Sequence, residues 1–389
     1  MIYNTLGKTG LEVSRLGFGT MRLPTFGSNA EINEEEASKM LEYGIENGIN
    51  IFDTAYPYHS DILGGSGNAE PFLGNFLKEN SLRDEIILQT KSPSWAIEEK
   101  GDFEFFLNEQ LEKLQTDYID IYLLHSLTAP GWSHVNSLGV LDFLDDCLSS
   151  GVVKHVGFSS HMEIDYMIEI LDEYPKWEVV LTQMNYLDEY YQTGVMGLNY
   201  LKANNIGSMI MEPLRGGRLV NNIPEEVKSW WEIAEVKRTP VEWALQYLWN
   251  RDDVDCVFSG MTSLEQVKEN IKYASNEDII NDYDQEIIRE VARQYKSTSL
   301  GNDCTRCGYC MPCPEGVDIV NCLTEYNIAQ MLRDPKASAM QYFSLIPEDS
   351  RADSCVGCEK CLPFCTQMLN IPEELQKVYE FFGSEFDHF

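Results

Sequence analysis

IFDTAYPYH occupies residues 51–59, ILQTK occupies residues 87–91 and IYLLH occupies residues 121–125. Each stretch opens with large apolar side chains, and one or more ionisable side chains follow them. Short apolar runs bounded by polar residues are typical of strands that are buried on both faces, as in parallel sheets. The three stretches therefore predict parallel strands whose C-terminal ends present polar groups.

Similar runs recur along the first 260 residues, and segments with a helical period separate them. The expected strands are residues 17–22, 50–55, 85–91, 118–125, 152–159, 179–185, 207–212 and 255–260. Eight strands that alternate with helices predict an α/β fold, a closed (β/α)8 TIM barrel. A doubly wound open sheet is the alternative, and the absence of GxGxxG after the first strand disfavours it.

Composition and charge exclude several classes of protein. The chain of 389 residues has 63 acidic and 29 basic side chains, which gives a net charge of −34 at pH 7. A surface this negative repels nucleic acid and anionic membranes, so we expect neither as a partner. The sequence has no run of about 18 apolar residues that could span a membrane. Its opening residues lack the apolar region of a signal peptide, so we expect a cytoplasmic protein.

Cysteines gather in two runs near the end of the chain. Eight of the 11 cysteines lie there, namely Cys304, Cys307, Cys310, Cys313, Cys355, Cys358, Cys361 and Cys365. Because disulfides are rare in cytosolic proteins, we interpret both runs as metal ligands. Three thiols at two-residue gaps suit an iron–sulfur cluster better than structural zinc, which is the alternative.

The fourth thiol of each run decides the two ligand sets. In two-cluster ferredoxins the fourth ligand of one cluster comes from the other run. That rule predicts one 4Fe-4S cluster on Cys304, Cys307, Cys310 and Cys365, and a second on Cys355, Cys358, Cys361 and Cys313. The first run has two residues rather than three before its fourth cysteine. We expect the remaining Cys147, Cys256 and Cys322 to be small buried apolar residues.

The chain thus divides into four expected parts. Residues 1–275 form the barrel, and residues 276–300 form a linker helix around YDQEIIREVARQYK. Residues 301–375 form a small α-helical ferredoxin-like iron–sulfur domain, and residues 376–389 form a C-terminal tail. We expect the chain from residue 383 onward to be loosely held, because terminal residues are seldom tied down.

Four ionisable side chains follow three consecutive expected strands. Asp53 and Tyr58 follow the second strand, Lys91 ends the third and His125 ends the fourth. The C-terminal ends of the strands build the active site in barrels of this kind. Each residue alone is compatible with an ordinary structural role, but the four together predict a catalytic cluster.

The cluster suits proton transfer to a carbonyl oxygen. A free tyrosine has a pKa of about 10, and we expect the Lys91 ammonium to lower that pKa by stabilising the phenolate. Asp53 would hold and orient Lys91, and His125 would orient the substrate carbonyl. Tyr58 is therefore the predicted acid/base, which protonates the oxygen while hydride reaches the carbon.

These residues carry a resemblance to the aldo/keto reductase family. The Asp and Tyr spacing of DTAYPYH matches the family, as do the TK and LLH of the next two strands and the opening YNTLGKTGLEVSRLGFGTMR. The resemblance covers residues 1–275 and implies NADP(H)- or NAD(H)-dependent interconversion of a small carbonyl and its alcohol. With its cysteine runs, the chain is similar to the branch of the family that carries a C-terminal ferredoxin-like 4Fe-4S domain.

The resemblance also implies a set of residues that bind the cofactor. They are Ser159, Ser160, Gln183 and Met211 around the nicotinamide, Leu214, Gly216 and Arg218 after the seventh strand, and Gly260, Gln266, Glu269 and Asn270 on the adenosine side. Ser160 replaces the usual Asn, and Met211 replaces a frequent aromatic residue. Gly260 and Gln266 stand where the family has basic residues for the 2′-phosphate. Arg215, Arg218 and Lys268 are the candidates to replace them, so NADPH and NADH both stay open.

Three interpretations explain why a barrel and clusters share one chain. In the first, the clusters relay single electrons to an external one-electron carrier in an oxygen-sensitive enzyme. A flavin is left open as the intermediary, because hydride carries two electrons. In the second, the clusters are structural or sense oxygen or iron. In the third, the chain is an electron-carrier subunit whose barrel only binds a partner, and the intact set of Asp53, Tyr58, Lys91 and His125 disfavours this interpretation.

A lyase or isomerase that uses the same Tyr–Lys pair is a further alternative, because fold does not fix function.

Overall fold

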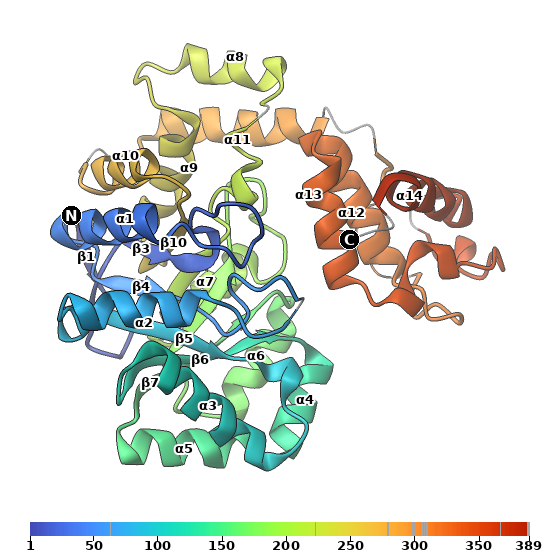
Figure 1. Ribbon diagram of the computed structural model, residues 1–389. Coiled ribbons are helices and arrows are strands. Elements are labelled where there is room, and N and C mark those ends of the chain that lie inside the picture. Colours follow the sequence, from blue (N-terminus) through green and yellow to red (C-terminus); the bar gives the residue numbers. More distant parts are fainter. Residues whose placement is uncertain are drawn as a thin grey trace. The chain divides into compact units, whose positions relative to one another are not determined.

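A computed structural model describes residues 1–62, 64–221, 223–277, 280–297, 301–304, 306, 308, 310–365 and 367–386. The chain divides into two compact units (Figure 1). The first unit holds residues 1–216 and 241–282, and the second holds residues 217–240 and 283–389. In the described part of the chain, no helix has the length and apolar character that crossing a membrane requires.

The first unit is built on a closed barrel of eight parallel strands. In chain order the strands are β3 (Leu16–Gly19), β4 (Ile51–Asp53), β5 (Ile87–Ser92), β6 (Ile119–Leu127), β7 (Val153–Ser160), β8 (Val179–Gln183), β9 (Gly207–Met211) and β10 (Cys256–Gly260). Each strand pairs with the next, and β10 closes the barrel on β3. The predicted (β/α)8 barrel is confirmed, and the doubly wound alternative is wrong.

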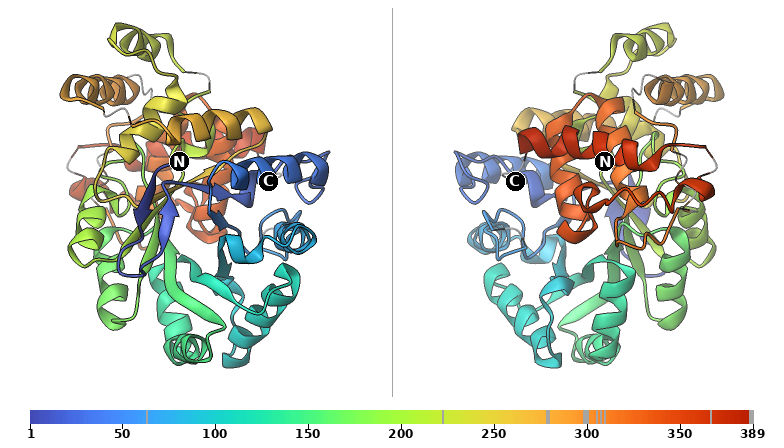
Figure 2. Two further views of the ribbon diagram at one scale, coloured as in Figure 1. Left: turned by 90° about the vertical axis from the view of Figure 1, so that its left-hand side faces the viewer. Right: turned by 90° about the vertical axis from the view of Figure 1, so that its right-hand side faces the viewer.

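Before the barrel, β1 (Tyr3–Thr5) and β2 (Glu12–Ser14) form an antiparallel hairpin, drawn in dark blue in Figure 2. The helices of the first unit are α1 (Glu34–Glu46), α2 (Ala69–Glu79), α3 (Lys100–Leu114), α4 (Ala129–Ser137), α5 (Val140–Ser150), α6 (Ile164–Glu173), α7 (Gly194–Ala203), α9 (Pro240–Trp249, whose first residue belongs to the second unit) and α10 (Leu264–Ala274). Helix α1 shows why they form: the Asn33 side chain accepts from the Glu36 N–H, and three glutamates occupy its first turn.

Two apolar layers hold the barrel together. Inward side chains of the strands fill its interior, including Ile121, Leu123, Leu181, Met209 and Cys256. Outward side chains pack against the helices in two larger clusters. The interior is thus a packed core, which leaves the C-terminal ends of the strands as the place for polar groups.

The second unit is helical. It contains α8 (Glu225–Ile233), α11 (Asp282–Ser297, whose first residue belongs to the first unit), α12 (Ile319–Leu332), α13 (Pro335–Leu345) and α14 (Ile371–Phe386). Helix α14 continues past residue 376, where the sequence predicts a tail. Its Leu375, Val378 and Phe382 are buried in the small core because their spacing of three and four residues places them on one helix face. The predicted domain boundaries themselves stay a prediction.

The three cysteines outside the two runs are buried as expected. Cys147 lies in the outer layer of the barrel, Cys256 inside it and Cys322 in the core of the helical unit. Burial raises the pKa of Cys147 and that of Cys322 to about 12. Both thiols therefore stay protonated and behave as small apolar groups.

Candidate active site

The four predicted catalytic side chains come from adjacent strands. Asp53 is the last residue of β4, Lys91 lies near the end of β5 and His125 lies near the end of β6. Tyr58 lies in the loop that follows β4. Because β4, β5 and β6 are neighbours in the barrel, the topology brings all four to the same end of it.

Close backbone contacts fix the loop that carries Tyr58. The Gly67 N–H donates to the Tyr56 carbonyl at 2.8 Å. A Cβ atom at Gly67 would lie 2.0 Å from the Tyr58 carbonyl oxygen, so only glycine fits there. The imidazole of His59 lies 2.7 Å from the Asn29 carbonyl and 3.1 Å from the Thr20 carbonyl. The loop is therefore tied down on both sides of the phenol.

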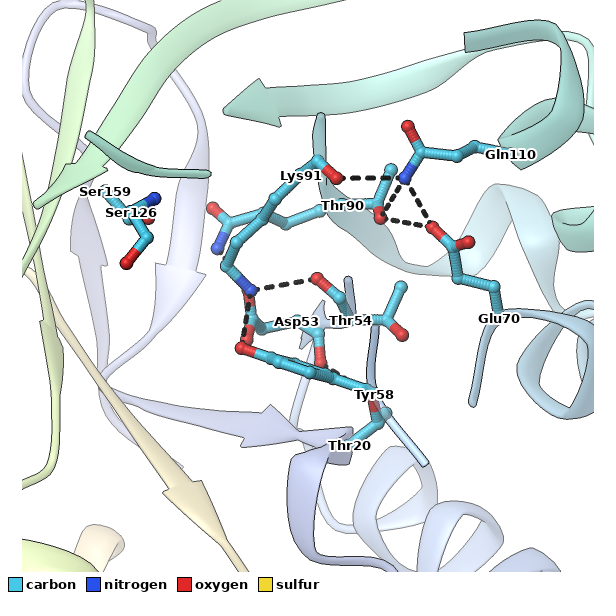
Figure 3. A network of polar contacts seen from close by, with 11 residues as sticks. Thr20, Asp53, Thr54, Tyr58, Glu70, Thr90, Lys91, Gln110, Ser126 and Ser159 are labelled. Atoms are coloured by element: carbon cyan, nitrogen blue, oxygen red, sulfur yellow. Dashed lines mark hydrogen bonds and ion pairs between the residues drawn. The ribbon is translucent and has the colours of Figure 1, made fainter. Parts of the chain in front are cut away.

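The Lys91 ammonium is the centre of the cluster (Figure 3). Its Nζ lies 2.5 Å from Asp53 Oδ1 and donates to Tyr58 Oη at 3.0 Å and to the Thr54 carbonyl at 2.9 Å. Lys91 is 1% exposed and Asp53 is 5% exposed. A buried ammonium with three oxygen partners is held in one position and keeps its charge.

Electrostatics around this pair correct one expectation. Burial lowers the pKa of Lys91, but Asp53 and Tyr58 raise it by more, so the net pKa lies above the usual value. Burial raises the pKa of Tyr58, and the opposing effect of Lys91 does not overcome it, because Asp53 also raises the pKa. The predicted lowering by Lys91 is present, but burial and Asp53 outweigh it, so the net pKa of Tyr58 lies above the usual value. The phenol is protonated, which is the form that can donate a proton.

His125 packs beside the phenol. Its ring centroid lies 6.0 Å from that of Tyr58 in an edge-on arrangement and 5.1 Å from that of Trp95. Burial, together with the positive charge of Lys91 and the nearby His161, holds the pKa of His125 well below its usual value. Within the described ranges, its Nδ1 has no hydrogen-bond partner. The imidazole is therefore neutral and presents one N–H as a donor.

The sequence reading missed a polar network behind Lys91, which Figure 3 shows. Glu70 of α2 accepts from Thr90 Oγ1 and from Gln110 Nε2, both at 2.6 Å. Gln110 Nε2 also donates to the Lys91 carbonyl at 3.0 Å, so the network fixes the backbone from which Lys91 extends. Glu70 falls on the apolar face of α2 with Leu73 and Leu77, and a charged residue on such a face was the available signal.

The predicted nicotinamide residues lie at the ends of β7, β8 and β9. Ser159 Oγ accepts from the Ser126 N–H at 2.8 Å, and Ser160 Oγ donates to the Leu127 carbonyl at 3.1 Å. Gln183 Nε2 donates to Asp188 at 2.6 Å. Met211 ends β9 and is half-buried. Their roles in binding a cofactor stay predictions.

The residues predicted around the adenosine and its phosphates fall into two groups. Gly260 ends β10, while Gln266, Glu269 and Asn270 lie on α10, where Asn270 donates to Ser259 Oγ at 3.1 Å. Leu214 and Gly216 follow β9 in the first unit. Arg218 instead belongs to the second unit, where its guanidinium donates to Ser338 Oγ at 3.0 Å and to Gln341 Oε1 at 2.5 Å.

The three candidates to replace the missing basic residues each interact with another residue of the chain. Arg215 is buried and pairs with Asp188 at 2.8 Å, and Arg218 holds helix α13. The ammonium of Lys268 lies 5.6 Å from the centroid of the Tyr43 ring. Recognition of a 2′-phosphate by any of them stays a prediction.

The cysteine runs lie in the second unit. Cys304, Cys310, Cys313, Cys355, Cys361 and Cys365 pack against its core, Cys358 is exposed, and Cys307 lies outside the described residues. Among the described residues, no three ligating side chains stand close enough to hold one metal ion. The pKa of Cys361 is raised by burial and further by Cys355, Cys358 and Cys313. Cys313 of the first run therefore lies close enough to Cys361 of the second to act on its pKa.

Comparisons with known proteins agree with this geometry. The profile of the Aldo/keto reductase family matches residues 15–293. L-galactose dehydrogenase from Arabidopsis thaliana is 29% identical over 313 residues, which cover 74% of this chain and 92% of that protein. NADH-specific methylglyoxal reductase from Escherichia coli (strain K12) is 24% identical over 332 residues, which cover 74% of this chain and 97% of that protein.

A solved structure shows the same likeness. The aldo-keto reductase AKR11C1 from Bacillus halodurans (holo form) superposes with a TM-score of 0.61 at 26% identity, covering 75% of this chain and 96% of that one. The region matched by the family profile spans the barrel from β3 to α10 and ends before the first cysteine run. The chain therefore belongs to the aldo/keto reductase family and is an NAD(P)H-dependent oxidoreductase.

Proposed function

We propose that this oxidoreductase interconverts a small aldehyde, ketone or sugar-like carbonyl with its alcohol, and that Tyr58 is the acid/base. The observation that carries the proposal is the position of Lys91 Nζ, 3.0 Å from Tyr58 Oη and 2.5 Å from Asp53. A bound nicotinamide cofactor supplies or accepts the hydride. Tyr58 donates the proton to the carbonyl oxygen, and the Lys91 ammonium stabilises the phenolate that results. Asp53 holds Lys91 in place.

Two features fit a substrate and a cofactor at this end of the barrel. Neutral His125 has one N–H that can orient the carbonyl oxygen beside Tyr58. Gln183 Oε1 is buried and has no hydrogen-bond partner in the described part of the chain. A buried carbonyl oxygen of this kind favours a ligand that brings a donor, as the nicotinamide carboxamide does.

The test is an anaerobic assay of NADH and NADPH oxidation with a panel of small aldehydes, ketones and sugars. We expect at least one carbonyl to be reduced with stoichiometric formation of its alcohol. If neither cofactor is oxidised by any member of the panel, and neither oxidised cofactor is reduced by the matching alcohols, carbonyl chemistry is not the function.

The second part of the proposal concerns two 4Fe-4S clusters in the helical unit. Its support is the spacing of the two cysteine runs, together with the effect of Cys313 of the first run on the pKa of Cys361 of the second, two residues that the crossed ligand set joins. A four-iron cluster is larger than one ion, so its thiolates stand farther apart than those around a single zinc. The clusters would relay single electrons to an external carrier, either directly or through a flavin.

If the clusters are present, replacing one cysteine ligand should remove one cluster, and the loss can be measured. Anaerobically purified protein should contain about eight irons and eight sulfides per chain, and Cys361→Ala should lower both by about half. Cys147→Ala, at a buried cysteine of the other unit, is the matched control and should leave both unchanged. Zinc in place of iron would contradict the clusters. Clusters that are not reduced by alcohol, cofactor and flavin together would contradict the relay but leave a structural role.

A further inference from the structure

Asp188 lies at the centre of a buried polar cluster just after β8. Its Oδ2 accepts from Gln183 Nε2 at 2.6 Å, from Asn185 Nδ2 at 2.8 Å and from Arg215 Nε at 2.8 Å. All four residues are 7% exposed or less. Three donors converge on one oxygen, so this carboxylate is held firmly in place.

The cluster decides which way the Gln183 amide faces. An ionised carboxylate only accepts hydrogen bonds, so the Gln183 NH2 group must face Asp188. The reverse orientation would place two acceptor oxygens 2.6 Å apart. Gln183 Oε1 therefore faces the other way, where it is buried without a hydrogen-bond partner in the described chain.

Ser159 supplies the complementary group. Ser159 pairs with Leu181 across β7 and β8, and strand side chains alternate, so Ser159 and Gln183 share one face of the sheet. The Ser159 oxygen already accepts from the Ser126 N–H, which leaves its hydroxyl hydrogen to donate. One donor and one acceptor on the same face match the carbonyl and the NH2 of a primary amide.

We infer that Asp188 is a positioning residue that fixes Gln183 with its oxygen toward the cofactor, where that oxygen accepts from the carboxamide NH2 group. This inference rests on the proposed placement of the nicotinamide. Asp188 touches neither substrate nor cofactor, and acts by excluding the flipped amide. Its loss lets Gln183 turn over, so that the protein no longer distinguishes a carboxamide from a group without N–H.

The test compares two reduced cofactors: the natural one, NADH or NADPH, and its 3-acetylpyridine analogue, which keeps the carbonyl but has methyl in place of NH2. Dissociation constants are measured by fluorescence in the wild type, in Asp188→Leu and in Asp145→Leu. Asp145 is a matched control because it is a half-buried aspartate that pairs with Lys176 and lies on α5. We expect the wild type and Asp145→Leu to bind the natural cofactor roughly tenfold more tightly than the analogue, the usual value of one such hydrogen bond.

In Asp188→Leu the ratio should fall to within about twofold, because leucine accepts no hydrogen bond and no longer selects one orientation of the Gln183 amide. A wild-type ratio retained in Asp188→Leu overturns the assignment, as does a wild type that binds both cofactors equally. If Asp188→Leu does not fold, Gln183→Met takes its place, and a retained ratio there is equally decisive. A wild type that binds neither natural cofactor overturns the proposed function as well, which distinguishes the two failures.

Discussion

Tyr58→Phe should lower kcat for carbonyl reduction by about 10²–10⁴-fold while the protein stays folded. The phenol is the only group of the quartet placed to give a proton from a neutral acid, and it receives a hydrogen bond from Lys91 at 3.0 Å. Phenylalanine removes that proton but keeps the ring that packs beside His125. The measurement is the steady-state rate with one carbonyl substrate, together with circular dichroism and the affinity for the reduced cofactor.

The pH dependence of the same reaction gives a second check on Tyr58. Reduction needs the protonated phenol, and burial raises the pKa of Tyr58 above its usual value of 10. A raised pKa extends the active form to higher pH, so kcat/KM for reduction should not fall on the alkaline side until above pH 10, provided the protein stays folded. A fall centred near pH 7 that disappears in Tyr58→Phe would mean that the phenol titrates low. Full activity of Tyr58→Phe would remove it from the mechanism altogether.

Lys91→Met should abolish activity and also destabilise the barrel by about 3–5 kcal/mol. The methionine leaves the Asp53 carboxylate buried without its cation, and Asp53 is only 5% exposed. Gln89 Nε2 still donates to Asp53 Oδ1 at 2.6 Å, but a neutral amide does not replace a charge. The measurement is the free energy of unfolding in urea, alongside the turnover number.

Two further variants separate charge from packing at Lys91. Lys39→Met removes an exposed ammonium, which pairs with Glu35 on the surface of α1, and should leave the free energy of unfolding nearly unchanged. Asp53→Asn combined with Lys91→Met removes both buried charges and should regain much of the lost stability without activity. If Lys91→Met alone is as stable as the wild type, the Asp53 carboxylate does not depend on the Lys91 ammonium for its burial, and the account of the buried ion pair is wrong.

The barrel and the four catalytic candidates were predictable because both depend on local patterns. Apolar runs identify the strands, and a residue at the end of a parallel strand must lie at the same end of the barrel as its neighbours. Strand limits shifted by a few residues: the expected strand 118–125 is β6, Ile119–Leu127. Register with neighbouring strands sets those ends, and register is not a property of a single segment.

Contacts between distant parts of the chain were not predictable. The sequence places Arg218 after the seventh strand as a phosphate ligand, yet its partner Ser338 lies 120 residues further along. The direction of the pKa shift of Tyr58 depends on how far the ring is buried and on how Asp53 offsets Lys91, and both are three-dimensional properties. The bond between Asp188 and Gln183 depends on how the chain turns after β8.

The central claim is that this end of the barrel joins hydride transfer to proton transfer from Tyr58. It is tested most directly by supplying reduced cofactor with deuterium at C4 of the nicotinamide and analysing the alcohol by mass spectrometry. The account predicts one deuterium on the former carbonyl carbon in the wild type and a product yield about 10²–10⁴-fold lower, at equal time, in Tyr58→Phe. An alcohol that carries no deuterium from either face of the cofactor, or equal yields from both proteins, would contradict it.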